Sequence, residues 1–292
     1  MPTDEKTLKT ADFPGVVEAA RAYLEDRRVR SAVFAVATPV DSDWVHLTNS
    51  PWAFSIEATR EALGLDDLAV INDFVAQALA VPQLGPEDLI KVGGGEPAPD
   101  RPIGVIGAGT GLGVAGLLPV VGGWQPVASE GGHVSFAPHD EVEAAVLAHL
   151  WQRFGHVSNE RLMAGPGLVN LAHALAGLQG RELEPLTPAQ VVQRARQATC
   201  PYCVEAVQRF PPLLGGAAGD LALMFCARGG VFIAGGVCPR LGELFDVERF
   251  RARFIAKGRF EDYLRPIPTY LVTRPDTGLL GAAALLVGLR TA

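Results

Sequence analysis

The alternation of its segments predicts that the chain is an α/β protein, and its composition predicts a globular one. Segments with the apolar spacing of helices alternate with short apolar runs that are typical of buried strands. The chain has 292 residues, of which 48% are hydrophobic and 20% charged, so it can bury the core of one large domain or two smaller ones. Its four cysteines are too few for a disulfide framework, and its polar start lacks the apolar core of a signal peptide. We therefore expect a reduced, cytoplasmic protein.

The first third of the chain shows this alternation most clearly. Apolar residues at 16–24 fall on one helical face, and the run at 31–40 follows as a buried strand. A helix, a strand and a second helix are then expected at 57–65, 68–72 and 73–81. The loop at 92–102 is rich in glycine and proline, which favours a hinge or a domain connection there.

Beyond this loop, apolar runs at 103–107 and 114–121 flank a series of glycines and predict a β-hairpin. No charged residue occurs from Ile103 to Ser129, but the density of glycine and two prolines argue against a membrane helix. A capping box from Thr187 to Gln190 opens a helix. The later elements are expected as helices at 141–154, 188–198 and 278–289 and as a strand at 229–237.

The glycine series lies between the two strands of the predicted hairpin. It is not a dinucleotide-binding fingerprint, because Leu112 stands where the third glycine is required and no helix follows. It is not a Walker loop either, since no Gly-Lys-Ser/Thr ends it. The backbone N–H groups from Gly109 to Gly113 and the hydroxyl of Thr110 can still bind a phosphate. The alternative is a strained hairpin turn without a ligand.

Four polar side chains are candidates for chemistry on a ligand. Asp73 follows a buried strand, where it can serve as a general base or simply cap the next helix. Glu130 and His133 enclose two glycines, so they can converge on sugar hydroxyls, or they form a salt-linked loop. Glu160 precedes a helical stretch, where an acid is commonly only a partner of the helix dipole.

Charge and cysteine spacing exclude several other functions. With 32 acidic and 25 basic residues the net charge is −7, and no basic cluster could follow nucleic acid or an anionic membrane. Cys200 and Cys203 form a single CxxC without a second pair, so we interpret them as structural rather than as a redox or zinc site. No metal site built from protein ligands is predicted.

Taken together, these stretches resemble the bacterial glucokinase family, a hexokinase-related group with an actin-like ATPase fold of the ribonuclease H type. The matching segments occur in the family's order and extend over nearly the whole chain. They are 38–55, VINDF (70–74), GAGTGLGVA (107–115), SEGGHVSFAP (129–138), SNERLMAGPGLVNL (158–171), GGVFIAGGVCPR (229–240) and KGRF (257–260).

The resemblance implies a role for each matching position. Asp73 corresponds to the catalytic base that takes the proton from the sugar's 6-hydroxyl. The positions that match sugar-binding residues are Asn72, Glu130, His133 and Glu160. Those that match the second phosphate loop are Gly109, Thr110, Gly111 and Gly113, and those near the adenosine are Gly235 and Gly236. The phosphate donor implied is ATP with bound Mg²⁺.

The resemblance also implies two domains that flank a cleft. The small domain is expected at 1–83, completed by the C-terminal helix at 274–292, and the large domain at 84–273. The predicted function is ATP-dependent phosphorylation of D-glucose to D-glucose 6-phosphate. The alternatives are a catalytically impaired glucose sensor or regulator, and a kinase for another hexose. Glucose and ATP are the expected partners, and a homodimer is left open.

One family feature does not occur in this sequence. Members begin with a strand and a turn of the type Asp-x-Gly-Gly-Thr, the first phosphate loop, whereas this chain matches from the third strand onward. An opening hairpin is therefore expected to be missing, and ordinary strand lengths put its size at about 25 residues. Its loss would leave a strand of the sheet unpaired at a new edge and favour aggregation. Either the sequence begins at an internal methionine of a longer glucokinase, or the nucleotide clamp is incomplete. We favour the first explanation because every later motif is intact.

Overall fold

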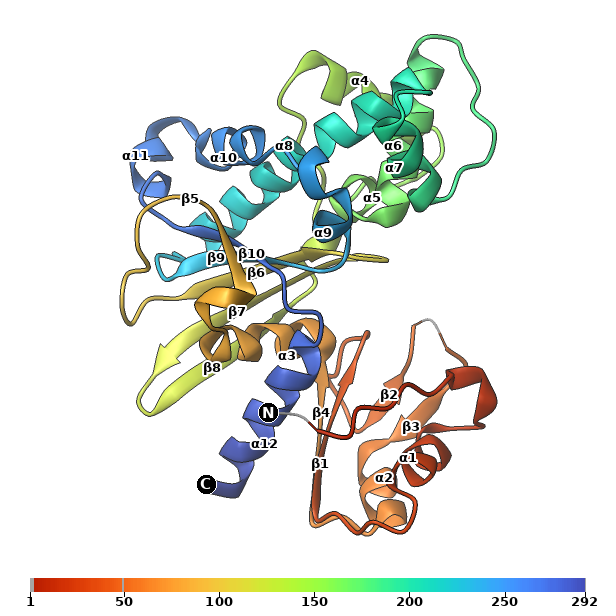
Figure 1. The fold of residues 1–292 in the computed structure, drawn as a ribbon, viewed down its shortest axis with the longest axis vertical. Coiled ribbons are helices and arrows are strands. Elements are labelled where there is room, and N and C mark those ends of the chain that lie inside the picture. Colours follow the sequence, from red (N-terminus) through yellow and green to blue (C-terminus); the bar gives the residue numbers. More distant parts are fainter. Residues whose placement is uncertain (1–2, 49, 292) are drawn as a thin grey trace. The chain divides into compact units, whose positions relative to one another are not determined.

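The computed structural model describes residues 3–48 and 50–291, with side chains to residue 287 (Figure 1). The chain divides into two compact units, with two small two-stranded sheets, β1-β4 and β2-β3, in the first and a six-stranded sheet in the second. Unit 1 comprises Met1–Gly85 and Arg274–Ala292, and unit 2 comprises Pro86–Thr273. Helices alternate with strands in both units, as the predicted α/β class requires.

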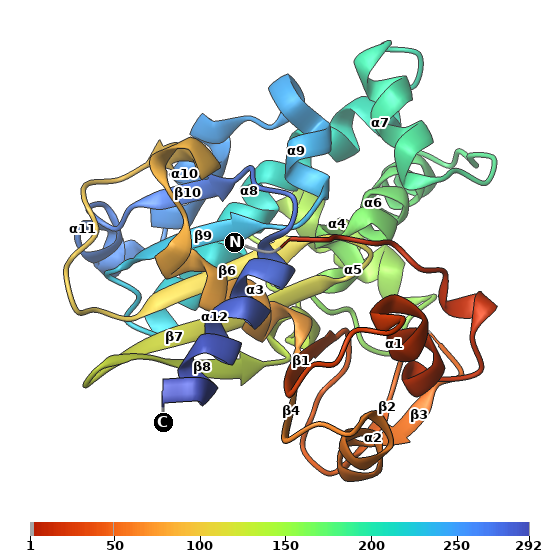
Figure 2. The same ribbon diagram turned by 60° about the horizontal axis from the view of Figure 1, so that its bottom comes forward.

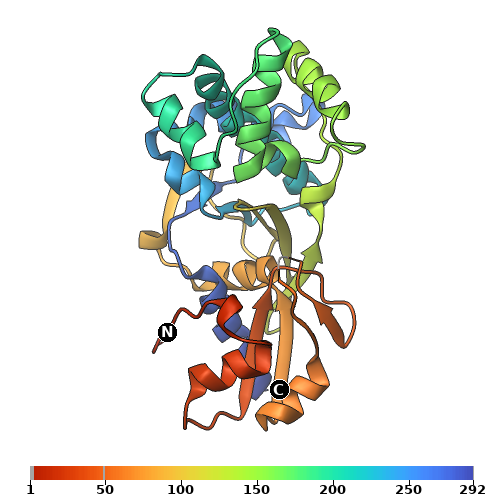
Figure 3. The same cartoon turned by 90° about the vertical axis from the view of Figure 1, so that its right-hand side faces the viewer.

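Unit 1 is built around two parallel strands, β1 and β4, which run side by side (Figure 3). Its helices are α1 (Val16–Leu24), α2 (Ile56–Leu63), α3 (Asp73–Ala80) and α12 (Thr277–Thr291). Its strands are β1 (Ser31–Val36), β2 (Trp44–His46), β3 (Ala53–Ser55) and β4 (Asp67–Asn72). The register pairs Ser31 with Asp67 and Val36 with Asn72, so both strands end at the same edge. The helix expected at 278–289 is α12, which packs against α3 and β1.

The packing of α12 on α3 depends on one glycine. A Cβ atom added to Gly281 would lie 1.7 Å from the carbonyl oxygen of Ala76, so the helices could no longer approach as they do. We expect Gly281→Ala to lower the free energy of unfolding by about 3 kcal/mol, as overpacked cores do. Gly278→Ala is the matched control, because nothing lies within 4 Å of its added Cβ in the same helix. Urea unfolding of both variants measures the difference, and equal stabilities would contradict this packing.

Unit 2 contains a six-stranded sheet and most of the helices. Its strands are β5 (Leu89–Gly93), β6 (Ile103–Ala108), β7 (Leu112–Val120), β8 (Gly123–Ser129), β9 (Gly230–Ala234) and β10 (Thr269–Val272). Its helices are α4 (Glu141–Trp151), α5 (Glu160–Met163), α6 (Gly165–Leu178), α7 (Pro188–Arg196), α8 (Pro201–Met224), α9 (Val237–Leu241), α10 (Val247–Ile255) and α11 (Glu261–Leu264).

The strand order of this sheet is β5-β10-β9-β6-β7-β8. Strands β6, β7 and β8 form an antiparallel meander, and β9 and β10 continue the sheet parallel to β6 (Figure 2). The predicted hairpin is therefore confirmed, with β6 buried along its whole length. The charge-free stretch at 103–129 forms these three strands, and no helix among the described residues is long and apolar enough to cross a membrane.

The loop at 92–102 is not a connection between domains, and the prediction of a hinge there was wrong. Strand β5 ends at Gly93 and pairs with β10, and the N–H of Gly95 donates to the carbonyl of Pro266 at 2.9 Å. The change of unit lies instead between Gly85 and Pro86, before β5 begins. A glycine and proline run therefore indicated a loop correctly, but it did not indicate which elements pair on either side of it.

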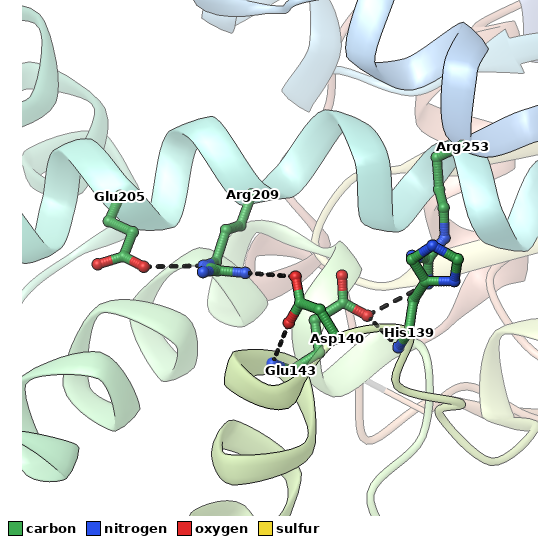
Figure 4. A network of polar contacts seen from close by, with 6 residues as sticks. All are labelled: His139, Asp140, Glu143, Glu205, Arg209 and Arg253. Atoms are coloured by element: carbon green, nitrogen blue, oxygen red, sulfur yellow. Dashed lines mark hydrogen bonds and ion pairs between the residues drawn. The ribbon is translucent and has the colours of Figure 1, made fainter.

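Polar contacts tie α4 to α8 and α10 within unit 2 (Figure 4). The buried carboxylate of Glu143 accepts the N–H of His139 at 2.7 Å and pairs with Arg253 at 3.2 Å. Asp140 caps α4 through the N–H of Glu143 and pairs with Arg209 at 3.2 Å. Burial alone would raise the pKa of Asp140, but these two contacts together lower it. The segment after His133 is thus anchored to two helices that lie far from it in sequence.

Candidate functional site

In unit 1, the candidate residues lie where β4 passes into α3. Asn72 is the last residue of the strand, and Asp73 is the first residue of the helix. The side-chain oxygen of Asn72 accepts the N–H groups of Phe74 at 2.8 Å and of Val75 at 3.4 Å. The helix cap is therefore Asn72, and the alternative in which Asp73 serves as the cap is wrong. Asn72 also donates to the carbonyl of Thr38 at 3.3 Å, which fixes its amide.

Asp73 is held at the carboxyl end of a parallel pair of strands, an edge at which α/β proteins bind ligands. Its Oδ1 accepts the N–H of Phe74 at 2.9 Å, and its side chain is partly buried. A carboxylate in the first turn of a helix is stabilised by the helix dipole. An ionised carboxylate can accept a proton from a hydroxyl.

In unit 2, the glycine series forms the turn from β6 to β7. The N–H of Gly109 donates to the carbonyl of Gly111 at 2.8 Å, and the carbonyl of Gly109 accepts the N–H of Gly165 at the start of α6, also at 2.8 Å. The N–H groups of Thr110 and Gly111 have no hydrogen-bond partner among the described residues. Since Thr110 is exposed and Gly111 half-buried, these donors can be reached by an anion.

Glu160 holds this turn from the other side. It is the first residue of the short helix α5, and its Oε2 accepts the N–H of Leu112 at 3.0 Å. A Cβ atom on Gly111 would lie 2.5 Å from the same oxygen, so only glycine leaves the carboxylate in place. Glu160 is therefore in contact with the turn, which its position in the sequence did not indicate.

Glu130 and His133 lie at the two ends of a single 3₁₀ turn that begins at Gly131. The N–H of His133 donates to the carbonyl of Glu130 at 2.9 Å, and the side chains approach with Nε2 3.9 Å from Oε2. Both side chains are more than half exposed. This approach fits both expectations for the pair, a salt-linked loop and two groups that bind one ligand.

Backbone pairing brings this turn beside α5. The N–H of Asn159 donates to the carbonyl of Val134, and the N–H of Phe136 donates to the carbonyl of Val157, both at 3.0 Å. An antiparallel bridge joins Ser135 to Ser158 between them. The segments that carry His133 and Glu160 are therefore adjacent, although 27 positions of sequence separate them.

A cavity of about 650 Å³ opens beside the glycine turn. Gly109, Thr110, Gly165 and Pro166 line it together with residues of α7. The remaining lining residues that matter for a ligand are Pro188, Val192, Gln193, Arg196, Val237 and Arg240. A mostly apolar cavity of this size next to unpaired N–H groups suits a flat heterocycle joined to an anionic group.

Gly235 and Gly236 precede α9, a helix with two residues that line this cavity. Gly235 has φ +83°, and a Cβ there would lie 2.4 Å from the carbonyl oxygen of Ala108. The two glycines turn the chain from β9 into α9, which brings Val237 and Arg240 to the cavity. The sequence indicated these glycines but missed the α7 residues, whose only signal was the capping box that opens the helix.

Cys200 and Cys203, which the sequence analysis interpreted as structural, do not line this cavity. Cys200 caps α8, with its Sγ 3.4 Å from the N–H of Cys203, and both thiols are buried and free. Burial raises the pKa of Cys203 to about 12, which keeps it a thiol. Among residues 3–48 and 50–291, no three His, Cys, Asp or Glu side chains are grouped so that they could hold a metal ion.

The fold of this chain also occurs in solved structures of known proteins. The fold is the actin-like ATPase fold, which is also that of a ROK family glucokinase from Streptomyces griseus solved with glucose and AMPPNP. That structure shares 22% identity and a TM-score of 0.60, with 92% of this chain and 86% of the other covered. At this identity the likeness concerns the fold alone.

Closer similarities identify the family. The family model described as glucokinase matches residues 1–288. The glucokinase of Chromobacterium violaceum is 49% identical over 286 residues, which cover 97% of this chain and 82% of that protein. The crystal structure of a glucokinase from an Antarctic psychrotroph has a TM-score of 0.88 and 37% identity, covering 97% of this chain and 89% of the other. The chain belongs to the glucokinase family.

Proposed function

We propose that this protein transfers the γ-phosphoryl group of ATP to the 6-hydroxyl of D-glucose, giving D-glucose 6-phosphate and ADP. The observation that carries the proposal is the glycine turn, whose N–H groups at Thr110 and Gly111 have no partner among the described residues and lie beside the 650 Å³ cavity. Backbone donors at such a turn suit the phosphates of a nucleotide, and the cavity suits its adenosine. Family membership supports the same reaction.

Each site residue has a role in this reaction. Asp73 accepts the proton of the 6-hydroxyl as O6 attacks the γ-phosphorus, and the bond to the β,γ-bridging oxygen of ATP breaks. The other hydroxyls of the sugar bind Asn72, Glu130, His133 and Glu160. Carboxylates and an imidazole discriminate well between sugars, because an analogue that lacks one hydroxyl leaves a polar group unpaired.

Phosphoryl transfer requires mainly alignment and charge stabilisation, so no covalent nucleophile is involved. The turn from Gly109 to Gly113 holds the phosphates through backbone N–H groups and the hydroxyl of Thr110. ATP carries Mg²⁺ on its own phosphates, and the ion, when bound, neutralises part of their charge. The cytoplasm, where both substrates are present, is the proposed location.

A coupled assay tests the proposal directly. Purified protein with glucose, ATP and Mg²⁺ should reduce NADP⁺ in the presence of glucose-6-phosphate dehydrogenase, and omission of ATP should stop the signal. Folded protein that binds glucose but forms no product would overturn the enzymatic role in favour of a sensor. Parallel assays with mannose and fructose, followed through ADP release, identify the preferred hexose.

A further inference from the structure

Glu160 makes a contact that its proposed role as a sugar ligand does not require. Its Oε2 accepts the N–H of Leu112, 48 positions away in sequence, at 3.0 Å. Leu112 is buried, so loss of the carboxylate would deprive a buried residue of the partner of its N–H. The other oxygen, Oε1, has no hydrogen-bond partner among the described residues. The carboxylate of Glu160 therefore anchors the glycine turn through Oε2, while Oε1 can still bind a ligand.

The turn is built to accept this carboxylate. Gly111, which precedes Leu112, carries one of the two unpaired N–H groups proposed to bind phosphate. Its missing Cβ is what allows Oε2 to approach, since that atom would lie 2.5 Å from the oxygen. Movement of the Glu160 carboxylate would therefore release Leu112 and change the direction of the neighbouring N–H of Gly111.

We infer that Glu160 is also the positioning residue of the phosphate turn, so that sugar binding and nucleotide binding are coupled through its two carboxylate oxygens. The inference rests on the proposed function. A sugar hydroxyl bound at Oε1 holds the carboxylate still, and the carboxylate in turn holds the N–H groups of the turn in their binding geometry. Because coupling between two ligands is reciprocal, a bound nucleotide must strengthen glucose binding by the same factor.

Nucleotide binding measured without sugar separates this role from a simple sugar contact. Isothermal titration with AMPPNP and Mg²⁺ should show an affinity about fivefold lower for Glu160→Ala than for the wild type, because the turn loses its fastening. Glu160→Gln should restore AMPPNP affinity, since its amide oxygen can still accept the N–H of Leu112, while glucose affinity stays low. Unchanged AMPPNP affinity in Glu160→Ala would overturn the inference.

Glucose binding measured without nucleotide gives the reciprocal test. Gly111→Ala should raise the Kd of glucose about tenfold, because the new methyl group displaces Oε2 although residue 111 is not itself a proposed sugar ligand. Gly123→Ala, at the start of β8 and outside the proposed site, is the control: nothing lies within 4 Å of its added Cβ, so its Kd for glucose should equal that of the wild type. Equal glucose affinities for Gly111→Ala and the wild type would overturn the inference.

Wild-type titrations distinguish this inference from the proposed function. Saturating glucose should increase the AMPPNP affinity of the wild type about fivefold, at the lower end of ordinary coupling between sites. Tight binding of both ligands without any mutual effect would overturn the coupling and leave the proposed kinase intact. A wild-type protein that binds neither ligand would overturn both.

Discussion

Asp73→Asn is expected to lower kcat for glucose phosphorylation about a thousandfold, within the range ascribed to general bases. The amide has nearly the shape of the carboxylate but cannot take the proton of the 6-hydroxyl. Glucose should still bind with a Kd within about threefold of the wild type, since the sugar's other hydroxyls bind elsewhere. The coupled assay measures kcat, and calorimetry measures the Kd.

The structure offers a control for this variant within the same strand. Asp67 is the first residue of β4, whereas Asp73 follows its last residue. The side chain of Asp67 is exposed, and its carboxylate accepts the hydroxyl of Ser31 at 3.3 Å. Asp67→Asn removes one negative charge without touching the edge of the sheet at which Asp73 lies, so kcat should be unchanged. Retained turnover in Asp73→Asn would exclude Asp73 as the base.

Val192→Trp is expected to raise the KM for ATP by at least about thirtyfold, because a loss of about 2 kcal/mol in binding corresponds to that factor. Val192 lies on α7 and lines the 650 Å³ cavity proposed for the adenosine. An indole there would occupy the space that the heterocycle needs. Initial rates at varied ATP and saturating glucose give the KM directly.

Two further measurements show whether the effect is steric. Val192→Ala leaves the cavity open, so its KM for ATP should change by no more than about threefold. The Kd of glucose measured without nucleotide should be the same in both variants and the wild type, because the cavity is lined by none of the proposed sugar ligands. A normal KM for ATP in Val192→Trp would place the adenosine outside this cavity.

Local patterns in the chain predicted much of the fold. The capping box at Thr187 opens α7 as expected, since its two hydrogen bonds involve only neighbouring residues. The hairpin of β6 and β7 around Gly109–Gly113 could be predicted for the same reason, since its strands are neighbours in the sequence. The full length of the 24-residue helix α8 could not be predicted from the sequence, because Pro211 and Pro212 argue against a continuous helix. Tertiary packing on α10 outweighs them.

The residues of the candidate site were also predictable only in part. Residue types and their order were enough to single out Asp73, Glu130, His133 and Glu160, because each stands in a motif that resembles the glucokinase family. The assignment of the helix cap to Asn72 rather than Asp73 depended on which side chain reaches the N–H groups of Phe74 and Val75.

The α/β class, the hairpin with its glycine turn and the family resemblance were contained in the sequence, since they arise from periodicity and from contacts between near neighbours. Only the tertiary structure could show that Glu160 fastens Leu112 across 48 positions, or that α7 forms a wall of the cavity beside Thr110. Such contacts depend on how whole elements pack, and no local pattern encodes the distance between two groups that far apart in the chain.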